Sequence, residues 1–362
     1  MKQFYSFFII LLLPFSISAQ ILINGEDSLF TSEAFSFNVK EGLDLMGIIT
    51  IPDKMTMNSP IAILVSPPQR ADKEYNGMFT SLAKALGQQG IVTLRFDNRS
   101  FTDTTLIVAD DVVTMFDHAD DVQAALKAIR MDKRFPNNPI GLIGHSEGGN
   151  SAIVEAARNK DVAFLITLST CGLTGAEFAY WQSTLFLSYP SRLPAKQRNA
   201  VVKDIYEKIQ IINTANSYSK TKNALIEQTK ENAIRNSLTL SDVEVENSVN
   251  RWMKPRLLAF IKYTPELYLS KIVCPVLAVH GMMDGTLDWK VNLDGIEKSF
   301  IKNGKTNYEM IALDKTDHSC QPANSVIPFF ISIHHAPNWM PSYSEGNWNK
   351  LAAWISKQNF NE

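Results

Sequence analysis

Short apolar runs and amphipathic stretches alternate along the first half of the chain. Alternating apolar and polar residues from 34 to 52 predict a β-hairpin that turns at Glu41-Gly42. Continuous apolar runs predict buried strands at residues 61–65, 91–96, 139–143 and 162–168. Between them, residues 79–87 and 117–130 carry apolar side chains at helical spacing. This order predicts a mostly parallel, doubly wound sheet with helices on both faces.

The pattern changes between residues 172 and 269. This stretch is rich in Lys, Glu, Asn and Gln, contains no convincing strand, and has helix-like segments at 195–212, 223–237 and 242–253. Strands resume at 276–280 and 308–313. A helical segment between two strands of one sheet predicts a cap at 172–269, inserted into a core made of residues 20–171 and 270–362.

The first 19 residues have the three-part layout of a secretory signal. Lys2 is followed by an apolar stretch at 7–13 and by small residues at 16–19. The apolar stretch is short for a bilayer span, which disfavours the alternative of an uncleaved membrane anchor. The sequence therefore predicts a signal peptide at 1–19 and a mature protein that starts near Gln20. We expect that protein to be periplasmic or secreted, without stable membrane insertion after cleavage.

Charge and composition exclude several partner classes. Lys and Arg together number 35 and Asp and Glu 37, so the formal net charge of −2 provides no global field for nucleic acid. The chain lacks a phosphate-binding loop of Walker type and a zinc-ligand cluster, so we expect neither a metal nor an organic cofactor. The 3 cysteines cannot all be paired within one chain. Cys274 falls in a predicted core strand, while the pairing of Cys171 with Cys320 stays open.

The most informative motif is Gly144-His-Ser-Glu-Gly-Gly149, directly after the strand predicted at 139–143 and before a helix predicted from residue 150. The flanking glycines permit a sharp turn that exposes the hydroxyl of Ser146. The N–H of Glu147, at the start of the helix, would then point to where an oxyanion forms. The motif predicts a nucleophile elbow.

A serine nucleophile needs a base, usually histidine, which a carboxylate orients. In doubly wound sheets these groups follow strands, here in the order serine, acid, histidine. His318 lies in the polar loop 314–319, after the last predicted strand, and is the expected base.

Asp284 is the expected acid because it follows the strand at 276–280. Asp288 competes for this role, and Asp317 is a weaker competitor. His280 ends the strand before Gly281, and we expect it to support the turn that carries the acid.

The second oxyanion donor should come from the loop after the strand at 61–65, which reads Ser-Pro-Pro-Gln-Arg. The two prolines have no N–H, so the first donor after them is the amide of Gln69.

With these residues in view, the chain resembles bacterial α/β hydrolases of the esterase, acyl-thioesterase and serine-aminopeptidase-like group, from about Phe35 to Ile355. The resemblance rests on the segments 141–149, 160–164, 274–281 and 317–318, with 255–265 similar to the segment that leads back from the cap. It implies an α/β-hydrolase fold with a Ser146–Asp284–His318 triad. Two segments depart from the family pattern. Ser66-Pro-Pro-Gln69 replaces a Gly-Ser-Gly-Pro-like loop, and Arg99-Ser-Phe-Thr102 replaces an Arg-Gly-x-Gly turn.

The function we expect is that of a serine hydrolase that cleaves carboxylic esters of small molecules through an acyl-enzyme on Ser146. Thioesters and small peptides are alternative substrates, the last through an aminopeptidase-like activity. The altered donor loop keeps open a further alternative, a hydrolase-fold binding protein with weak or lost activity.

Overall fold

The computed structural model describes residues 29–40, 42–102, 112–188, 194–326 and 342–360. The predicted signal peptide at 1–19 lies outside these residues and stays a prediction. Within the described ranges, no helix is long and apolar enough to cross a membrane.

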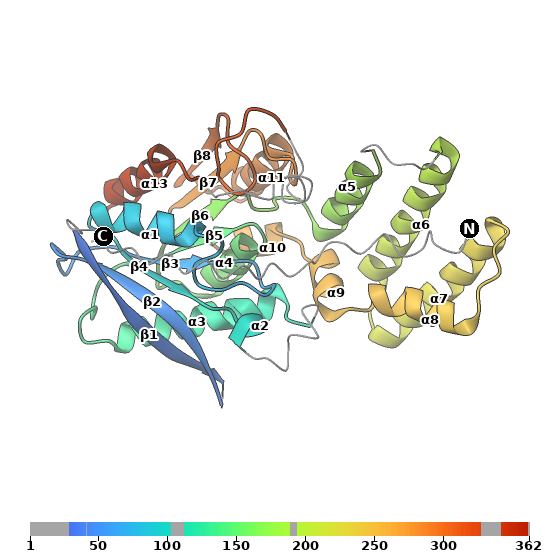
Figure 1. The fold of residues 1–362 in the computed structure, drawn as a ribbon, viewed down its shortest axis with the longest axis horizontal. Helices are drawn as coiled ribbons and strands as arrows, with labels where there is room; N and C mark the ends of the chain where they lie inside the picture. Colours follow the sequence, from blue (N-terminus) through green and yellow to red (C-terminus); the bar gives the residue numbers. More distant parts are fainter. Residues whose placement is uncertain (1–28, 41, 103–111, 189–193, 327–341, 361–362) are drawn as a thin grey trace. The chain divides into compact units, whose positions relative to one another are not determined.

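An 8-stranded sheet forms the centre of the larger part of the chain, with the strand order β1-β2-β4-β3-β5-β6-β7-β8 (Figure 1). The strands are β1 (Phe30–Lys40), β2 (Leu43–Pro52), β3 (Ile61–Val65), β4 (Val92–Phe96), β5 (Ile140–His145), β6 (Val162–Leu168), β7 (Val276–Gly281) and β8 (Tyr308–Leu313). β1 and β2 form an antiparallel hairpin, and β2 runs antiparallel to β4. Every pair from β4 to β8 is parallel. The predicted mostly parallel sheet is confirmed.

Two layers of helices cover the sheet. Those against one face are α3 (Met115–Met131), α4 (Glu147–Arg158), α10 (Glu266–Leu269) and α11 (Trp289–Lys302). Those against the other face are α1 (Met78–Gln88) and α13 (Glu345–Lys357). Side chains alternate along each strand: Ile61 and Ile63 of β3 join the first apolar cluster, whereas Ala62 joins the second. Because both faces are covered, all five residues of β3 are buried.

The described residues divide into two compact units, 29–172 with 265–360, and 173–264. The second unit consists of α5 (Gly175–Ser188), α6 (Ala195–Thr214), α7 (Tyr218–Arg235), α8 (Asp242–Trp252) and α9 (Pro255–Ile261). Among its described residues there is no strand. Its own apolar core includes Ile209, Leu225 and Val249. The insertion predicted from the sequence ends at residue 269. In the structure α10 contacts α4 and α11, so it belongs to the unit that contains the sheet.

Local sequence explains where α8 and α9 of this second unit begin. Ser241 accepts a hydrogen bond from the N–H of Glu244, whose carboxylate accepts one from the N–H of Ser241, which makes a capping box at the start of α8. Pro255 occupies the first turn of α9, where its missing N–H has no helical partner to lose.

Candidate active site

The segment from β5 to α4 forms a sharp turn with Ser146 at its apex. Ser146 has φ 53° and ψ −128°, a conformation with positive φ that costs a non-glycine residue free energy. Its N–H donates to the carbonyl of Leu168 on β6, at 2.9 Å, which holds the turn on the sheet. The predicted elbow geometry is therefore present in the structure.

Glycines make this turn possible because backbone and side chains approach them too closely for a Cβ atom. A Cβ on Gly144 would lie 2.6 Å from the carbonyl oxygen of Gly148, and one on Gly148 would lie 2.4 Å from that of Ser66. At Gly149 it would lie 1.8 Å from the hydroxyl of Thr170. Gly149 is therefore as necessary to the turn as Gly144 and Gly148, the two glycines that flank Ser146 most closely.

Asp284 lies in the loop that follows β7, and it is 6% exposed. Its Oδ1 accepts hydrogen bonds from the N–H groups of Thr286 and Leu287, at 2.7 and 2.8 Å. These two bonds fix the orientation of the carboxylate and leave its second oxygen, Oδ2, to make other contacts.

The loop after β8 carries His318 and packs on the end of β7. The N–H of Met283 donates to the carbonyl of Thr316 at 2.8 Å. A Cβ on Gly281 would lie 2.3 Å from the same carbonyl oxygen, so glycine there permits the close approach of the two loops. This packing brings the histidine loop against the loop of the acid.

The structure brings Ser146, His318 and Asp284 together in one chain of contacts. Nε2 of His318 lies 3.1 Å from Oγ of Ser146, and Nδ1 lies 2.8 Å from Oδ2 of Asp284. Since a carboxylate only accepts, Nδ1 carries the proton and Nε2 of the neutral ring is left to accept one from the serine. These distances lie in the range required of a nucleophile, its base and the group that orients the base.

Electrostatics reinforce this arrangement. Burial lowers the pKa of His318, but the adjacent carboxylate of Asp284, and after it that of Asp317, outweigh burial and raise that pKa above its ordinary value. Burial raises the pKa of Asp284, whereas His318, His280 and the N–H of Leu287 lower it, and the net result is a pKa below its usual range. The pair is arranged to hold a proton on the imidazole rather than on the acid.

The two competing aspartates have other structural roles. Asp288 is the N-cap of α11 and accepts from the N–H of Val291 at 3.0 Å. Asp317 accepts from the N–H of Gln321 at 2.8 Å, and burial raises its pKa. Asp284 is the member of the three that contacts Nδ1 of His318.

His145, inside the elbow motif, has a structural role that sequence reasoning missed. Its Nε2 donates to the carbonyl of His318 at 2.8 Å, and its Nδ1 accepts from the hydroxyl of Tyr75 at 3.1 Å. Burial, and next the proximity of His318, lower the pKa of His145 to about 3, so the ring is neutral in this arrangement. The elbow motif does not indicate this contact, because His318 lies 173 residues away in the sequence.

His280 lies beside the acid and hydrogen-bonds to the backbone after β6. Its Nε2 donates to the carbonyl of Thr170 at 2.9 Å, and its Nδ1 lies 3.8 Å from Oδ2 of Asp284. Burial lowers the pKa of His280, so the imidazole facing the acid is neutral. At 3.8 Å His280 makes no hydrogen bond to Asp284, so its support of the acid turn stays a prediction.

The two expected oxyanion donors lie on segments that meet at the elbow. Glu147 is the first residue of α4, and the N–H groups of the first turn of a helix point out of its N-terminal end. Gln69 lies in the loop after β3, and this loop reaches the elbow through the close contact of Ser66 with Gly148. The carbonyl of Gln69 accepts a hydrogen bond from the side chain of Asn98. The donor roles of both amides stay predictions.

The last candidates for reactive groups are the three cysteines and clusters of metal-ligating side chains. Cys171, Cys274 and Cys320 are buried and none of them forms a disulfide, so Cys171 and Cys320 are not paired. Burial raises the pKa of Cys274 to about 11 and that of Cys320 further, which makes neither a nucleophile near neutral pH. In the part of the chain that the structure describes, no three His, Cys, Asp or Glu residues are grouped to hold a metal ion.

Comparison with solved structures shows the same fold in several hydrolases. Est1E from Butyrivibrio proteoclasticus, with ferulic acid bound, matches with a TM-score of 0.51 and 15% identity over 90% of this chain and 99% of that chain. An esterase from Pyrococcus furiosus matches with a TM-score of 0.51 and 14% identity over 91% of both chains. The acylaminoacyl peptidase of Pyrococcus horikoshii matches with a TM-score of 0.50 and 13% identity over 92% of this chain and 43% of that one. At these identities the similarity shows the α/β-hydrolase fold alone.

Comparison at the level of sequence shows the family. No curated protein matches the chain. The family described as serine aminopeptidase, S33, matches residues 73–288, more than half of the chain, and this stretch includes Ser146 and Asp284. The chain therefore belongs to the serine aminopeptidase, S33, family of hydrolases.

Proposed function

We propose that this protein is a serine hydrolase that cleaves carboxylic esters through an acyl-enzyme on Ser146. The observation that carries the proposal is the chain of contacts from Oγ of Ser146 through the imidazole of His318 to Asp284, at 3.1 and 2.8 Å. A serine hydroxyl has little nucleophilicity of its own near neutral pH, and a neutral imidazole at this distance supplies the base.

In the proposed reaction, Ser146 Oγ attacks the carbonyl carbon of the ester and its proton passes to Nε2 of His318. The Asp284 carboxylate stabilises the imidazolium that forms. The N–H groups of Glu147 and Gln69 stabilise the oxyanion. The imidazolium then returns its proton to the departing alcohol. Water, activated by the same histidine, hydrolyses the acyl-enzyme and releases the carboxylic acid.

An ester is the preferred substrate class for two reasons. One of the structurally similar proteins is an esterase by name, and another, Est1E, has ferulic acid, a carboxylic acid, bound. A thioester would pass through the same acyl-enzyme, because only the leaving group differs.

Aminopeptidase activity is the second candidate, and the family name favours it. An aminopeptidase needs a carboxylate for the free amine of its substrate, and the acidic residues Glu177, Asp204 and Glu207 of the unit 173–264 are candidates for this role. Each of the three has partners inside the unit 173–264. Lys208 contacts Asp204 at 2.6 Å, Arg235 contacts Glu207 at 3.0 Å, and Glu177 accepts from the N–H of Thr174 at 3.0 Å. These engaged carboxylates favour the ester over the peptide.

The test is a panel of p-nitrophenyl esters of increasing acyl length, one thioester and one aminoacyl p-nitroanilide, assayed with the wild-type protein and with Ser146→Ala. We expect ester turnover that falls by at least about 10³-fold in the variant. Equal rates in the two proteins would support the binding-protein alternative, and turnover of the anilide alone would support the aminopeptidase.

A further inference from the structure

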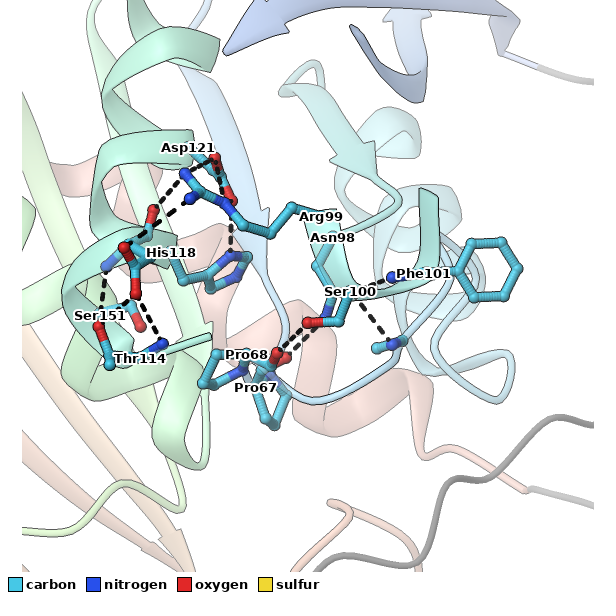
Figure 2. A network of polar contacts seen from close by, with 12 residues as sticks. Pro67, Pro68, Asn98, Arg99, Ser100, Phe101, Thr114, His118, Asp121 and Ser151 are labelled. Atoms are coloured by element: carbon cyan, nitrogen blue, oxygen red, sulfur yellow. Dashed lines mark hydrogen bonds and ion pairs between the residues drawn. The ribbon is translucent and has the colours of Figure 1, made fainter. Parts of the chain in front are cut away.

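The short segment Asn98–Phe101 follows β4 and includes most of the helix α2 (Arg99–Thr102). Its side chains contact the loop that carries the expected oxyanion donor. Figure 2 shows the side chains of Asn98 and Ser100 directed toward Pro67 and Pro68. Both side chains are fully buried. The contact joins the two segments that depart from the family pattern, Ser66–Gln69 and Arg99–Thr102.

The amide of Asn98 uses all of its hydrogen-bonding capacity to connect these segments. Its Nδ2 donates to the carbonyl of Pro67 at 3.0 Å and to that of Gln69. Its Oδ1 accepts from the N–H of Ala71 at 3.3 Å and from that of Phe101 at 3.1 Å. One side chain therefore fixes both ends of the Pro67–Ala71 loop.

Ser100 fixes the peptide whose N–H we expect to act as the donor. Its hydroxyl donates to the carbonyl of Pro68 at 2.9 Å. The peptide between Pro68 and Gln69 is trans, so the N–H of Gln69 lies in the same plane and points away from that carbonyl. A hydrogen bond to the carbonyl of Pro68 consequently sets the direction of the N–H of Gln69.

The segment itself is anchored to α3. The guanidinium of Arg99 makes a bidentate pair with Asp121, at 2.9 and 2.6 Å, and also donates to the carbonyl of Asp117 at 2.9 Å. Figure 2 shows this pair beside His118. The guanidinium of Arg70 lies over the ring of Phe101, 5.5 Å from its centroid, which ties the loop to the segment once more.

We propose that Ser100 and Asn98 are positioning residues that orient the N–H of Gln69 as the second oxyanion donor. This inference rests on the proposed function, since it assigns a role in the same reaction. The carbonyls of Pro67, Pro68 and Gln69 are all held toward α2, while the start of the loop packs on Gly148 of the elbow. Where the family pattern has a glycine after the arginine, this chain has Ser100. Its hydroxyl holds the carbonyl of Pro68 in the proline-containing loop.

The test compares Ser100→Ala and Asn98→Ala with the wild-type protein in steady-state kinetics on the best ester of the panel. An oxyanion donor acts mainly in the transition state, so kcat should fall by about 10- to 100-fold while KM changes by less than about 3-fold. Affinity for an alkyl trifluoromethyl ketone should fall in parallel. Ser146 Oγ adds to the carbonyl carbon of this inhibitor, its proton passes to His318, and the carbonyl oxygen becomes an oxyanion.

The chain offers matched controls at a distance from the elbow. Asn138 is also fully buried and donates from Nδ2 to two carbonyls, those of Thr56 and Ser59, at 3.0 and 2.8 Å. Ser59 is buried and its hydroxyl accepts from the N–H of Thr56 at 3.0 Å. Asn138→Ala and Ser59→Ala should lower the unfolding midpoint and leave kcat unchanged.

The outcomes separate the two proposals. If folded Ser100→Ala keeps kcat and inhibitor affinity within about 2-fold of wild type, or if the controls lose as much kcat, the positioning role is wrong while the hydrolase remains. If the wild-type protein turns over no substrate of the panel, the proposed function itself fails. Should Asn98→Ala not fold, Ser100→Ala decides, because it removes a single hydroxyl.

Discussion

His318 is subject to two opposing influences, burial and a neighbouring negative charge. Burial alone would lower its pKa, and the carboxylate of Asp284 at 2.8 Å reverses the sign. A base must be neutral to accept the proton of Ser146, so the same carboxylate that stabilises the imidazolium in the reaction also sets the pH at which the reaction begins.

Asp284→Asn tests this coupling. In the wild-type protein we expect kcat/KM to rise with pH as His318 loses its proton, with a midpoint above the ordinary histidine pKa of about 6.5. The substitution removes the charge and keeps the burial, so the midpoint should move to lower pH. The plateau should fall by up to about 10⁴-fold, as it does when this carboxylate is replaced in a serine protease. The measurement is a pH–rate profile of both proteins.

Asp294→Asn is the matched control, because Asp294 is paired with Lys290 on the exposed side of α11. Its profile should overlay that of the wild type. A midpoint that stays in place or moves upward in Asp284→Asn would contradict the assignment of Asp284 as the charge that raises the pKa of His318.

At the scale of elements, the turn from β5 to α4 concentrates close contacts. Three glycines of one motif are approached by the backbone of the turn, by the loop after β3 and by Thr170 after β6. The strained backbone conformation of Ser146 persists because the packing of these neighbours fixes the turn.

Gly149→Ala measures how tightly the turn is packed. A Cβ at this position would lie 1.8 Å from Oγ1 and 2.8 Å from Cβ of Thr170, so the neighbours must move. We expect the substitution to lower the free energy of unfolding by about 1–3 kcal/mol, as overpacking does. Denaturant titration of the purified variant gives this value.

Gly346→Ala is the comparison, in the first turn of α13. The nearest atom to its Cβ would be the hydroxyl of Ser344 at 3.6 Å, an ordinary contact, so stability should change by no more than about 0.5 kcal/mol. Equal midpoints for the wild type and Gly149→Ala would show that the turn is looser than its contacts indicate.

At the scale of the whole molecule, the sequence predicted what depends on local pattern and on the order of elements. The parallel strands, the elbow at Ser146 and the positions of Asp284 and His318 follow from apolar runs and from the loops after them. Strand β1 starts at Phe30, earlier than the alternation at residue 34 indicated. Its first residues are partly or fully exposed, so little apolar pattern marks them.

The contacts that the sequence did not predict join side chains to distant backbone. The bond from His145 to the carbonyl of His318, and those from Asn98 and Ser100 to the loop at 67–69, depend on how the loops pack. Every residue has a backbone carbonyl, so the residue types in a sequence do not show which carbonyl accepts a hydrogen bond from a distant side chain. For the same reason, the Arg99–Thr102 segment appeared as a departure from a family pattern, although its side chains support the neighbouring loop.

The central claim is that Ser146 is the nucleophile, and covalent labelling tests it most directly. A fluorophosphonate probe is added to folded protein, and the modified peptide is identified by mass spectrometry. Serine oxygen displaces fluoride from phosphorus, and the proton passes to the base. We predict one label per chain, on Ser146, and loss of labelling in Ser146→Ala and after unfolding. Folded protein that stays unlabelled while a control serine hydrolase reacts, or a label on another residue, would contradict the account.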